Sequence, residues 1–201
     1  MKGIDVETTA LDPADGELRL VQISDGNEYA TVYDTHYNSP SEIEAAIQAE
    51  DLLVAYNAVF EPKWLKAALN LDRADLHDTM TMSQVYYAGT RAGLRSDFSH
   101  SLAAVVKREL KVELAKDEQT SDWGATALTR AQLEYAARDA AVLLKLADRL
   151  MRKRDRAGLR KTYELERRVS HARGGKMYGV VAASGVRWTH GGRTLSEWLE
   201  P

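Results

Sequence analysis

The sequence predicts an α/β protein in which a mixed sheet, an antiparallel meander followed by parallel strands, is flanked by helices and followed by a helical C-terminal extension. Three β-rich stretches, around residues 2–9, 18–24 and 28–33, are separated only by turn-like segments at residues 12–16 and 25–27. Strands joined this tightly pair as antiparallel neighbours. Later apolar stretches alternate with helical patterns, which adds parallel strands and covers the sheet with helices.

Apolar spacing indicates where the helices and the later strand lie. A helix is expected to begin at Ser41, because apolar side chains follow it at helical spacing. Residues 52–56 form an apolar run typical of a buried strand, and Pro62 suits the first turn of the next helix. Further helices are expected over residues 80–88 and 101–110.

The best-specified helix begins after Thr129 and should run to about residue 152. Thr129 and Gln132 match a capping box, in which each side chain bonds to the backbone N–H of the other residue. Asp139 lies on this helix among apolar neighbours. A carboxylate in such a surface costs on the order of several kcal/mol unless it is paired or binds a metal, so Asp139 is a candidate ligand.

The composition excludes several kinds of protein. The chain has 201 residues, 44% of them hydrophobic, which is enough for one α/β domain with a core and an appendage. It has no cysteine, which excludes disulfides, thiolate zinc sites and a cysteine nucleophile. No signal-peptide pattern or apolar run of about 20 residues occurs, so we expect a cytoplasmic protein of a bacterial or phage-infected cell, with no membrane partner.

Charge is distributed unevenly along the chain. Residues 1–150 contain 15 Lys and Arg against 25 Asp and Glu, whereas residues 151–201 contain 12 against 5. An acidic body binds phosphate backbones poorly without metals or local help. The change predicts two domains, residues 1–152 and a basic, partly helical extension over residues 153–201. The basic run either helps to hold a polyanion or is an ordinary solvated helix face.

Asp5 and Glu7 form the first candidate site. Residues i and i+2 of a strand point to the same side, so Ile4 and Val6 can face a core while the two acids face one point. Like charges this close repel each other, and a divalent cation bound by oxygen ligands relieves the repulsion. The pair therefore predicts metal-assisted phosphodiester chemistry.

A second group of polar side chains follows the apolar run at residues 52–56. There Asn57, Phe60 and Glu61 supply an amide, an aromatic ring and a carboxylate just before a helix. Other interpretations of these residues stay open. Asn57 also fits a loop cap, Phe60 a core residue, and Glu61 an acid at a helix N-terminus, where acids are favoured.

Three pairs of side chains occur in a set order: Asp5-x-Glu7, Asn57-x-x-x-Glu61 and Tyr135-x-x-x-Asp139. Together they resemble the motifs of the DEDD exonuclease superfamily in its tyrosine-bearing branch. That branch includes RNase D, Werner-type exonucleases and the proofreading domain of family A DNA polymerases, which this chain resembles most. The resemblance covers residues 1 to about 150 and implies an RNase H-like fold with a mixed five-stranded sheet. Family members usually have aspartate where this chain has Glu61, whose longer side chain moves the carboxylate outward.

The resemblance also implies a two-metal hydrolysis with Mg²⁺ or Mn²⁺. Four acids would hold the two divalent cations: Asp5, Glu7, Glu61 and Asp139. Tyr135 would orient the attacking water, although its position also suits a core aromatic. Four further side chains would contact the terminal nucleotide: Thr8, Leu11, Asn57 and Phe60.

The activity implied is that of a 3′-5′ exonuclease that releases nucleoside 5′-monophosphates from the 3′ end of single-stranded DNA, in proofreading and with a DNA polymerase as partner. Residues 153–201 resemble the segment that joins the exonuclease domain to the thumb in such polymerases, which fits either a stand-alone subunit or part of a polymerase. Two alternatives stay open. One is an RNase D-like 3′-5′ exoribonuclease acting on RNA, and the other is a catalytically weakened exonuclease-like scaffold that binds a polymerase or strand ends, favoured only by Glu61.

Overall fold

The computed structural model describes residues 1–26, 29–73, 76–95, 97–114, 118 and 120–170. Its elements follow in the order β1 (Lys2–Thr8), β2 (Leu18–Ser24), β3 (Ala30–Asp34), α1 (Pro40–Gln48), β4 (Leu53–Ala55), α2 (Phe60–Leu69), β5 (His77–Asp78), α3 (Thr79–Tyr87), α4 (Leu102–Leu110) and α5 (Arg130–Arg156). Residues 160–170 form a further helix. No helix within these ranges is long and apolar enough to cross a membrane.

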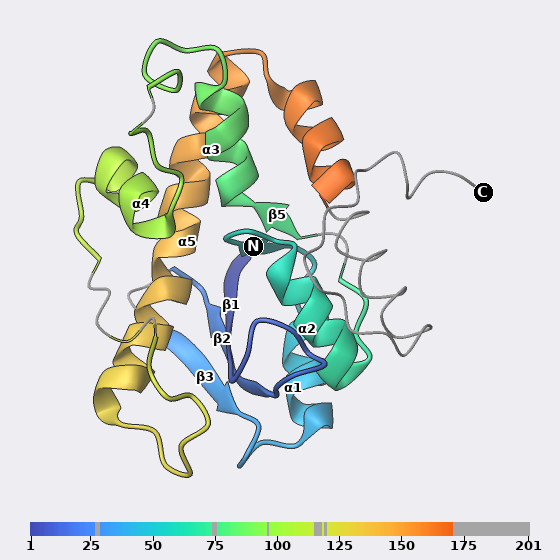
Figure 1. Cartoon of the computed structure of the whole chain (residues 1–201). Coiled ribbons are helices and arrows are strands. Elements are labelled where there is room, and N and C mark those ends of the chain that lie inside the picture. The colour runs from blue at the N-terminus through green and yellow to red at the C-terminus, as the bar shows by residue number, and fades with distance from the viewer. Residues whose placement is uncertain (27–28, 74–75, 96, 115–117, 119, 171–201) are drawn as a thin grey trace.

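The five strands form one mixed sheet in the order β3-β2-β1-β4-β5 (Figure 1). β1, β2 and β3 pair as antiparallel neighbours, whereas β4 and β5 continue the sheet beside β1 as parallel strands. The predicted fold class, a meander followed by parallel strands with flanking helices, is confirmed. Because β1 and β4 run in parallel, their carboxyl ends meet at the same edge of the sheet, and the residues after them are brought together.

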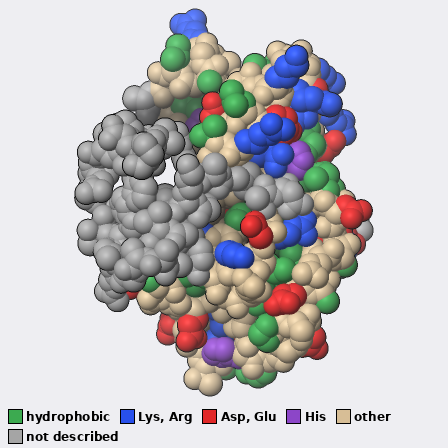
Figure 2. Space-filling view, turned by 90° about the vertical axis from the view of Figure 1, so that its right-hand side faces the viewer, with side chains coloured by type: hydrophobic (Ala, Val, Ile, Leu, Met, Phe, Trp, Pro, Cys, Tyr) green, Lys and Arg blue, Asp and Glu red, His purple; other side chains and the backbone are tan. Residues whose placement is uncertain are grey.

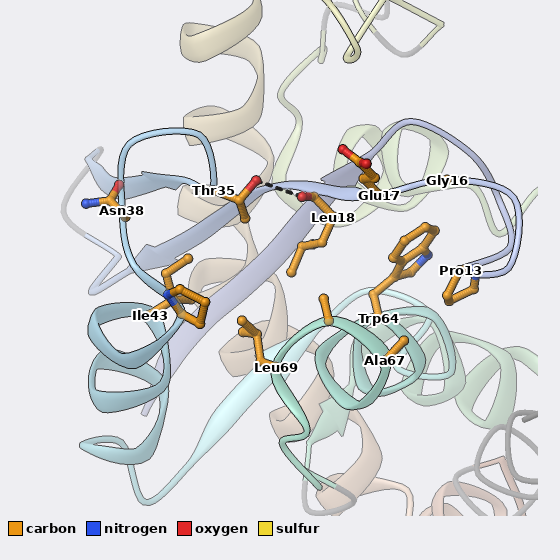
Figure 3. Close-up of a pocket in the computed structure, with 12 residues that line it drawn as sticks. Pro13, Gly16, Glu17, Leu18, Thr35, Asn38, Ile43, Trp64, Ala67 and Leu69 are labelled. Atoms are coloured by element: carbon orange, nitrogen blue, oxygen red, sulfur yellow. Dashed lines mark hydrogen bonds between the residues drawn. The ribbon is translucent and has the colours of Figure 1, made fainter.

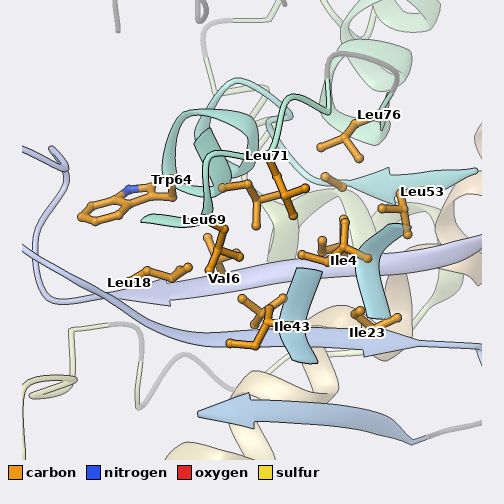
Figure 4. Packing of buried hydrophobic residues seen from close by; sticks show 14 of the residues in the cluster. Ile4, Val6, Leu18, Ile23, Ile43, Leu53, Trp64, Leu69, Leu71 and Leu76 are labelled. Atoms are coloured by element: carbon orange, nitrogen blue, oxygen red, sulfur yellow. The ribbon is translucent and has the colours of Figure 1, made fainter. Parts of the chain in front are cut away.

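One face of the sheet carries the main core under α1 and α2. Ile4 and Val6 of β1 are buried there against Ile43 of α1 and Leu69 of α2 (Figure 4). Since side chains alternate along a strand, the residues between and beside Ile4 and Val6 face the other side of the sheet.

Helix α5 covers that other side. The Gln132 N–H donates to the Thr129 hydroxyl over 3.2 Å and the Thr129 N–H donates to Gln132 Oε1 over 2.8 Å, which confirms the predicted capping box. The helix ends at Arg156, four residues beyond the predicted end. Gly3 lets α5 approach closely, because a Cβ there would stand 2.5 Å from the Ala140 carbonyl oxygen.

The predicted start of α1 at Ser41 was wrong. The helix begins at Pro40 and is capped by Ser39, whose side chain accepts a hydrogen bond from the Glu42 N–H. The Glu42 carboxylate accepts in return from the Ser39 N–H over 2.7 Å. Pro40 takes a position where a helix needs no backbone donor, so this capping box outweighs the alternative start.

The helix over residues 160–170 packs back onto β5. Tyr163 is fully buried, and its hydroxyl accepts a hydrogen bond of 3.1 Å from the Asp78 N–H. Residues 171–201, which make up most of the thumb-like extension predicted over residues 153–201, lie outside the described residues.

The basic part of the chain begins within α5, which continues past the boundary predicted after residue 152, and the division into two domains stays a prediction. Figure 2 shows Lys and Arg side chains gathered on the upper part of one face, at the end of the molecule where α5 terminates. Some of this charge is paired, since Asp155 accepts from Arg154 and from Arg160 at 2.8 and 3.0 Å.

Candidate active site

Three carboxylates lie between β1 and α5. Asp5 and Glu7 occupy the face of β1 turned toward α5, and Asp139 is 9% exposed on α5. Burial, and then repulsion from Asp139, raises the pKa of Asp5 to about 7. Burial and the two aspartates raise the pKa of Glu7 to about 9, and burial raises that of Asp139 to about 6. The three groups cannot all ionise without compensating positive charge.

Tyr135 lies one helical turn before Asp139, and its hydroxyl hydrogen-bonds to the Asp139 carboxylate. Burial, and then the charges of Asp139 and Glu7, raises the pKa of the phenol far above its ordinary value. The indole of Trp123 lies beside it, with ring centroids 6.4 Å apart. Tyr135 therefore stays a neutral phenol, which can both donate and accept a hydrogen bond.

Glu61 is in the first turn of α2 and is 1% exposed. Its Oε2 atom has no hydrogen-bond partner among the described residues. Burial, and then repulsion from Asp5, raises the pKa of Glu61 well above its ordinary value. The second motif thus lies within electrostatic range of the first, and a buried acid with one unpaired carboxyl oxygen is destabilising when ionised.

The loop that precedes α2 and Glu61 is held by Asp78, which is 1% exposed at the end of β5. Its Oδ1 accepts hydrogen bonds from the N–H groups of Asn57 and Met80 at 3.0 and 2.9 Å, so Asp78 acts here as a structural hydrogen-bonding group. The backbone of Asn57 has a φ of 63°, in the left-handed region that asparagine tolerates. Phe60 is half-buried with its ring 6.2 Å from that of Trp64, so part of its surface belongs to the core.

Leu11 is 83% exposed in the loop between β1 and β2. Lys63 of α2 holds this loop, since its Nζ donates to the Leu11 carbonyl oxygen over 3.3 Å and to Asp12 Oδ2 over 3.2 Å. At the start of the loop the Thr8 hydroxyl donates to the Ala10 carbonyl oxygen over 2.6 Å. An apolar side chain is thereby presented to solvent on a tethered loop that follows the first acid pair.

A family model described as 3′-5′ exonuclease matches residues 3–155, most of the chain. The chain belongs to the 3′-5′ exonuclease family. DNA polymerase I of Aquifex aeolicus is 35% identical to this exonuclease over 143 residues, which are 71% of the chain and 22% of the polymerase. The exonuclease chain thus spans about a fifth of the length of this curated relative.

Solved structures share the fold of the exonuclease. NrnC of Brucella melitensis has a TM-score of 0.74 and 25% identity, with 95% of this chain and 89% of NrnC covered. RNase D of Escherichia coli has a TM-score of 0.70 and 23% identity, with 85% and 44% covered. Further NrnC structures hold pGG or Mg²⁺. The predicted recognition of the exonuclease family and fold is confirmed.

The donor set of the candidate site suits a hard divalent cation. The site offers carboxylate oxygens, the ligands that Mg²⁺ and Mn²⁺ prefer. A cation would offer a partner to the unpaired Glu61 Oε2 atom and would relieve the repulsion between Asp5 and Asp139 when both are ionised. Across the described residues, no three Asp, Glu or His side chains already form a group that could hold a metal ion. The acids are therefore close enough to repel one another, but they do not yet surround a common point.

A separate pocket of about 320 Å³ lies on the other face of the sheet (Figure 3). Pro13 and Trp64 line one part of it, and Ile43 and Leu69 line another. Its lining contains none of the predicted ligand acids. The candidate site is therefore distinct from this pocket.

Arg19 supports the site and was missed in the sequence. It is 1% exposed on β2 and forms a bidentate ion pair with Asp34, in which Nε and Nη2 donate to the two carboxylate oxygens at 2.9 and 3.0 Å. Its Nη1 also donates to the carbonyl oxygens of Ala125 and Trp123 at 2.6 and 3.4 Å, which holds Trp123 beside Tyr135. The signal was present, because a charged residue interrupts an apolar strand, but the sequence does not reveal which distant carbonyls it would bind.

Proposed function

We propose that this chain is a metal-dependent 3′-5′ exonuclease that hydrolyses the terminal phosphodiester of single-stranded DNA and releases nucleoside 5′-monophosphates. The observation that carries the proposal is the meeting of Asp5, Glu7 and Asp139 beside a neutral tyrosine, with pKa values raised by burial and mutual repulsion. Membership of the exonuclease family gives this cluster a matching chemistry.

Asp5, Glu7, Glu61 and Asp139 would hold two divalent cations, Mg²⁺ or Mn²⁺, which supply charge neutralisation and Lewis acidity at the phosphate. The Tyr135 phenol donates to Asp139 and keeps an oxygen lone pair with which to orient the attacking water.

The terminal nucleotide would meet residues that lie near the acids in sequence. Leu11 would wedge against the terminal base from its tethered loop, and Thr8, Asn57 and Phe60 would contact the sugar or base. Positioning of this kind contributes strongly to catalysis, because a displacement of about 1 Å can lower the rate on the order of 100-fold.

DNA is the proposed substrate because the curated relative with 35% identity is a DNA polymerase. A proofreading role, with a DNA polymerase as partner, follows from the same relative. Short RNA is the second candidate, supported by NrnC, which matches over 89% of its own length and has been solved with pGG. A matched pair of DNA and RNA oligonucleotides distinguishes the two substrates.

The decisive experiment follows 5′-labelled single strands of DNA and RNA with Mn²⁺, using wild-type protein and Asp5→Ala. We expect stepwise shortening from the 3′ end by the wild type and loss of that activity in Asp5→Ala. Asp148→Ala is the matched control, since Asp148 is exposed on α5 and pairs with Arg152. Full activity in Asp5→Ala would refute the assignment.

The scaffold alternative is tested by calorimetric titration with Mn²⁺. Binding that Asp5→Ala abolishes supports catalysis, because the acids then act as ligands. A wild-type protein that binds no Mn²⁺ and shortens neither strand would instead favour the scaffold.

A further inference from the structure

Gln22 of β2 lies directly opposite Asp5 of β1 in the antiparallel ladder. Directly opposite residues place their side chains on the same face of a sheet, with Cβ atoms about 4.5–5.5 Å apart. The carboxamide of Gln22 is therefore the cross-strand neighbour of the Asp5 carboxylate.

Helix α5 packs over the face of the sheet that carries Asp5 and Gln22. On one side of it, Leu20, which is opposite Glu7, packs with Ala136 of α5. On the other side, Gly3 approaches the carbonyl oxygen of Ala140. The pair of Asp5 and Gln22 lies between these two contacts, beneath the turn of α5 that carries Asp139.

Gln22 is 0% exposed, yet neither its Oε1 nor its Nε2 atom has a hydrogen-bond partner among the described residues. An unsatisfied buried polar group is rare in native proteins and calls for an explanation. Its polar neighbours on the same strand are satisfied, because Arg19 binds Asp34 and the Ser24 hydroxyl donates to the Tyr29 carbonyl oxygen. An apolar residue in place of Gln22 would fill the same space without this cost.

We infer that Gln22 is a positioning residue of the proposed exonuclease site, whose carboxamide N–H groups donate to the Asp5 carboxylate once that carboxylate is ionised and holds a cation. The inference rests on the proposed function. An ionised carboxylate only accepts hydrogen bonds, and a glutamine amide supplies two donors without adding charge. Partners of this kind fix the orientation of metal ligands.

The inference predicts opposite effects on stability and on function. In the metal-free protein, Gln22→Met removes an unsatisfied amide while it keeps an unbranched side chain, so the urea midpoint should stay the same or rise. In the metal-bound protein the same change removes the group that orients Asp5. Mn²⁺ affinity and kcat should each fall about 10- to 100-fold, with KM nearly unchanged.

Gln132→Met is the matched control. Gln132 is also a buried glutamine, but it caps α5 and its Nε2 donates to the Asp122 carbonyl oxygen over 3.1 Å. Its replacement should lower the urea midpoint and leave the Mn²⁺ affinity of the folded protein unchanged. Gln22→Leu, which also lacks donors, is the second variant in case Gln22→Met packs badly.

The three measurements are urea unfolding in EDTA, calorimetric Mn²⁺ titration and steady-state kinetics on a labelled strand. Gln22 variants that lose stability but bind Mn²⁺ as the wild type does would overturn the inference and make Gln22 a structural residue. Failure of the proposed function is distinguishable, because a wild type that shortens no strand still yields the unfolding and Mn²⁺ results. Unchanged affinity in both Gln22 variants would also overturn the inference.

Discussion

The stability of the metal-free protein should fall as the pH rises from about 5 to 9. A carboxyl group with a higher pKa in the folded than in the unfolded chain binds its proton more tightly when folded. Its contribution to stability is present below the unfolded pKa and is lost as the pH rises through the folded pKa. For Asp5 this window runs from 3.8 to about 7, and for Glu7 it runs from 4.5 to about 9.

The size of the loss follows from Asp5. The difference between 3.8 and about 7 corresponds to about 4 kcal/mol, since one pH unit is equivalent to about 1.4 kcal/mol. About 3 kcal/mol of this is lost between pH 5 and 9, because the part between 3.8 and 5 is already lost at pH 5. The acids repel one another, so their contributions do not add, and about 3 kcal/mol is the expected scale of the loss over this range. Typical domains are stable by about 5–15 kcal/mol, so the loss is measurable.

Other titrating groups do not mask this trend. Acids outside the site such as Asp12, whose pKa is lowered by a hydrogen bond from the Ala14 N–H, contribute fully above about pH 5 and stay constant in this window. His100 acts in the opposite direction, because burial lowers its pKa and its contribution rises with pH near 6.5. Asp5→Asn retains every histidine, so its comparison with the wild type isolates the carboxylates.

The assay is urea unfolding in EDTA at several pH values, repeated with Mn²⁺. We expect the urea midpoint of the metal-free wild type to fall as the pH rises, and that of Asp5→Asn to change less with pH. Mn²⁺ should restore the midpoint of the wild type at high pH, because a ligand that binds only the folded state stabilises it. A metal-free wild type that is as stable at pH 9 as at pH 5 would show that the acids are not buried together.

Two further changes test the surroundings of the site. Arg19→Met should destabilise the protein by about 3–5 kcal/mol in urea unfolding, because it leaves the Asp34 carboxylate without its cationic partner and frees two carbonyl groups. Asp34→Asn in the same chain should recover part of the loss, and a change of less than about 1 kcal/mol would contradict the network. Leu11→Ala should change the free energy of unfolding by less than about 0.5 kcal/mol, because Leu11 is 83% exposed. The same change should raise KM for a labelled strand. An unchanged KM would remove Leu11 from the proposed nucleotide contacts.

The elements with strong periodic patterns were predictable from the sequence, and the weakly patterned ones were not. The capping box at Thr129 and the strand Leu18–Ser24 both appear where the sequence indicates. β5 has only two residues, His77 and Asp78, too few for a periodic signal. It is a strand because β4 pairs with it and Tyr163, remote in the sequence, binds its backbone.

In the candidate site, too, local sequence patterns predict some residues and miss others. The spacing of Asp5 and Glu7 directly predicts that they share a face, because alternation along a strand is a local property. The approach of Glu61 depends on the parallel pairing of β4 with β1, and the family resemblance supplied that information before the structure did. Gln22 was missed because its role depends on register, which places it opposite Asp5 and which no local pattern reveals.

The separation of β1 and α5 couples the fold to the proposed chemistry. Gly3, Ala136 and Ala140 lack large side chains, so the helix backbone approaches the strand closely enough to bury Asp139 over Asp5. The same approach creates the repulsion that destabilises the metal-free protein. A larger residue at position 3 would push α5 outward, relieve the repulsion and separate the ligands. The close packing that a cation site requires is thus inseparable from a cost to the metal-free fold, which the long capped helix and the buried Arg19 network help to offset.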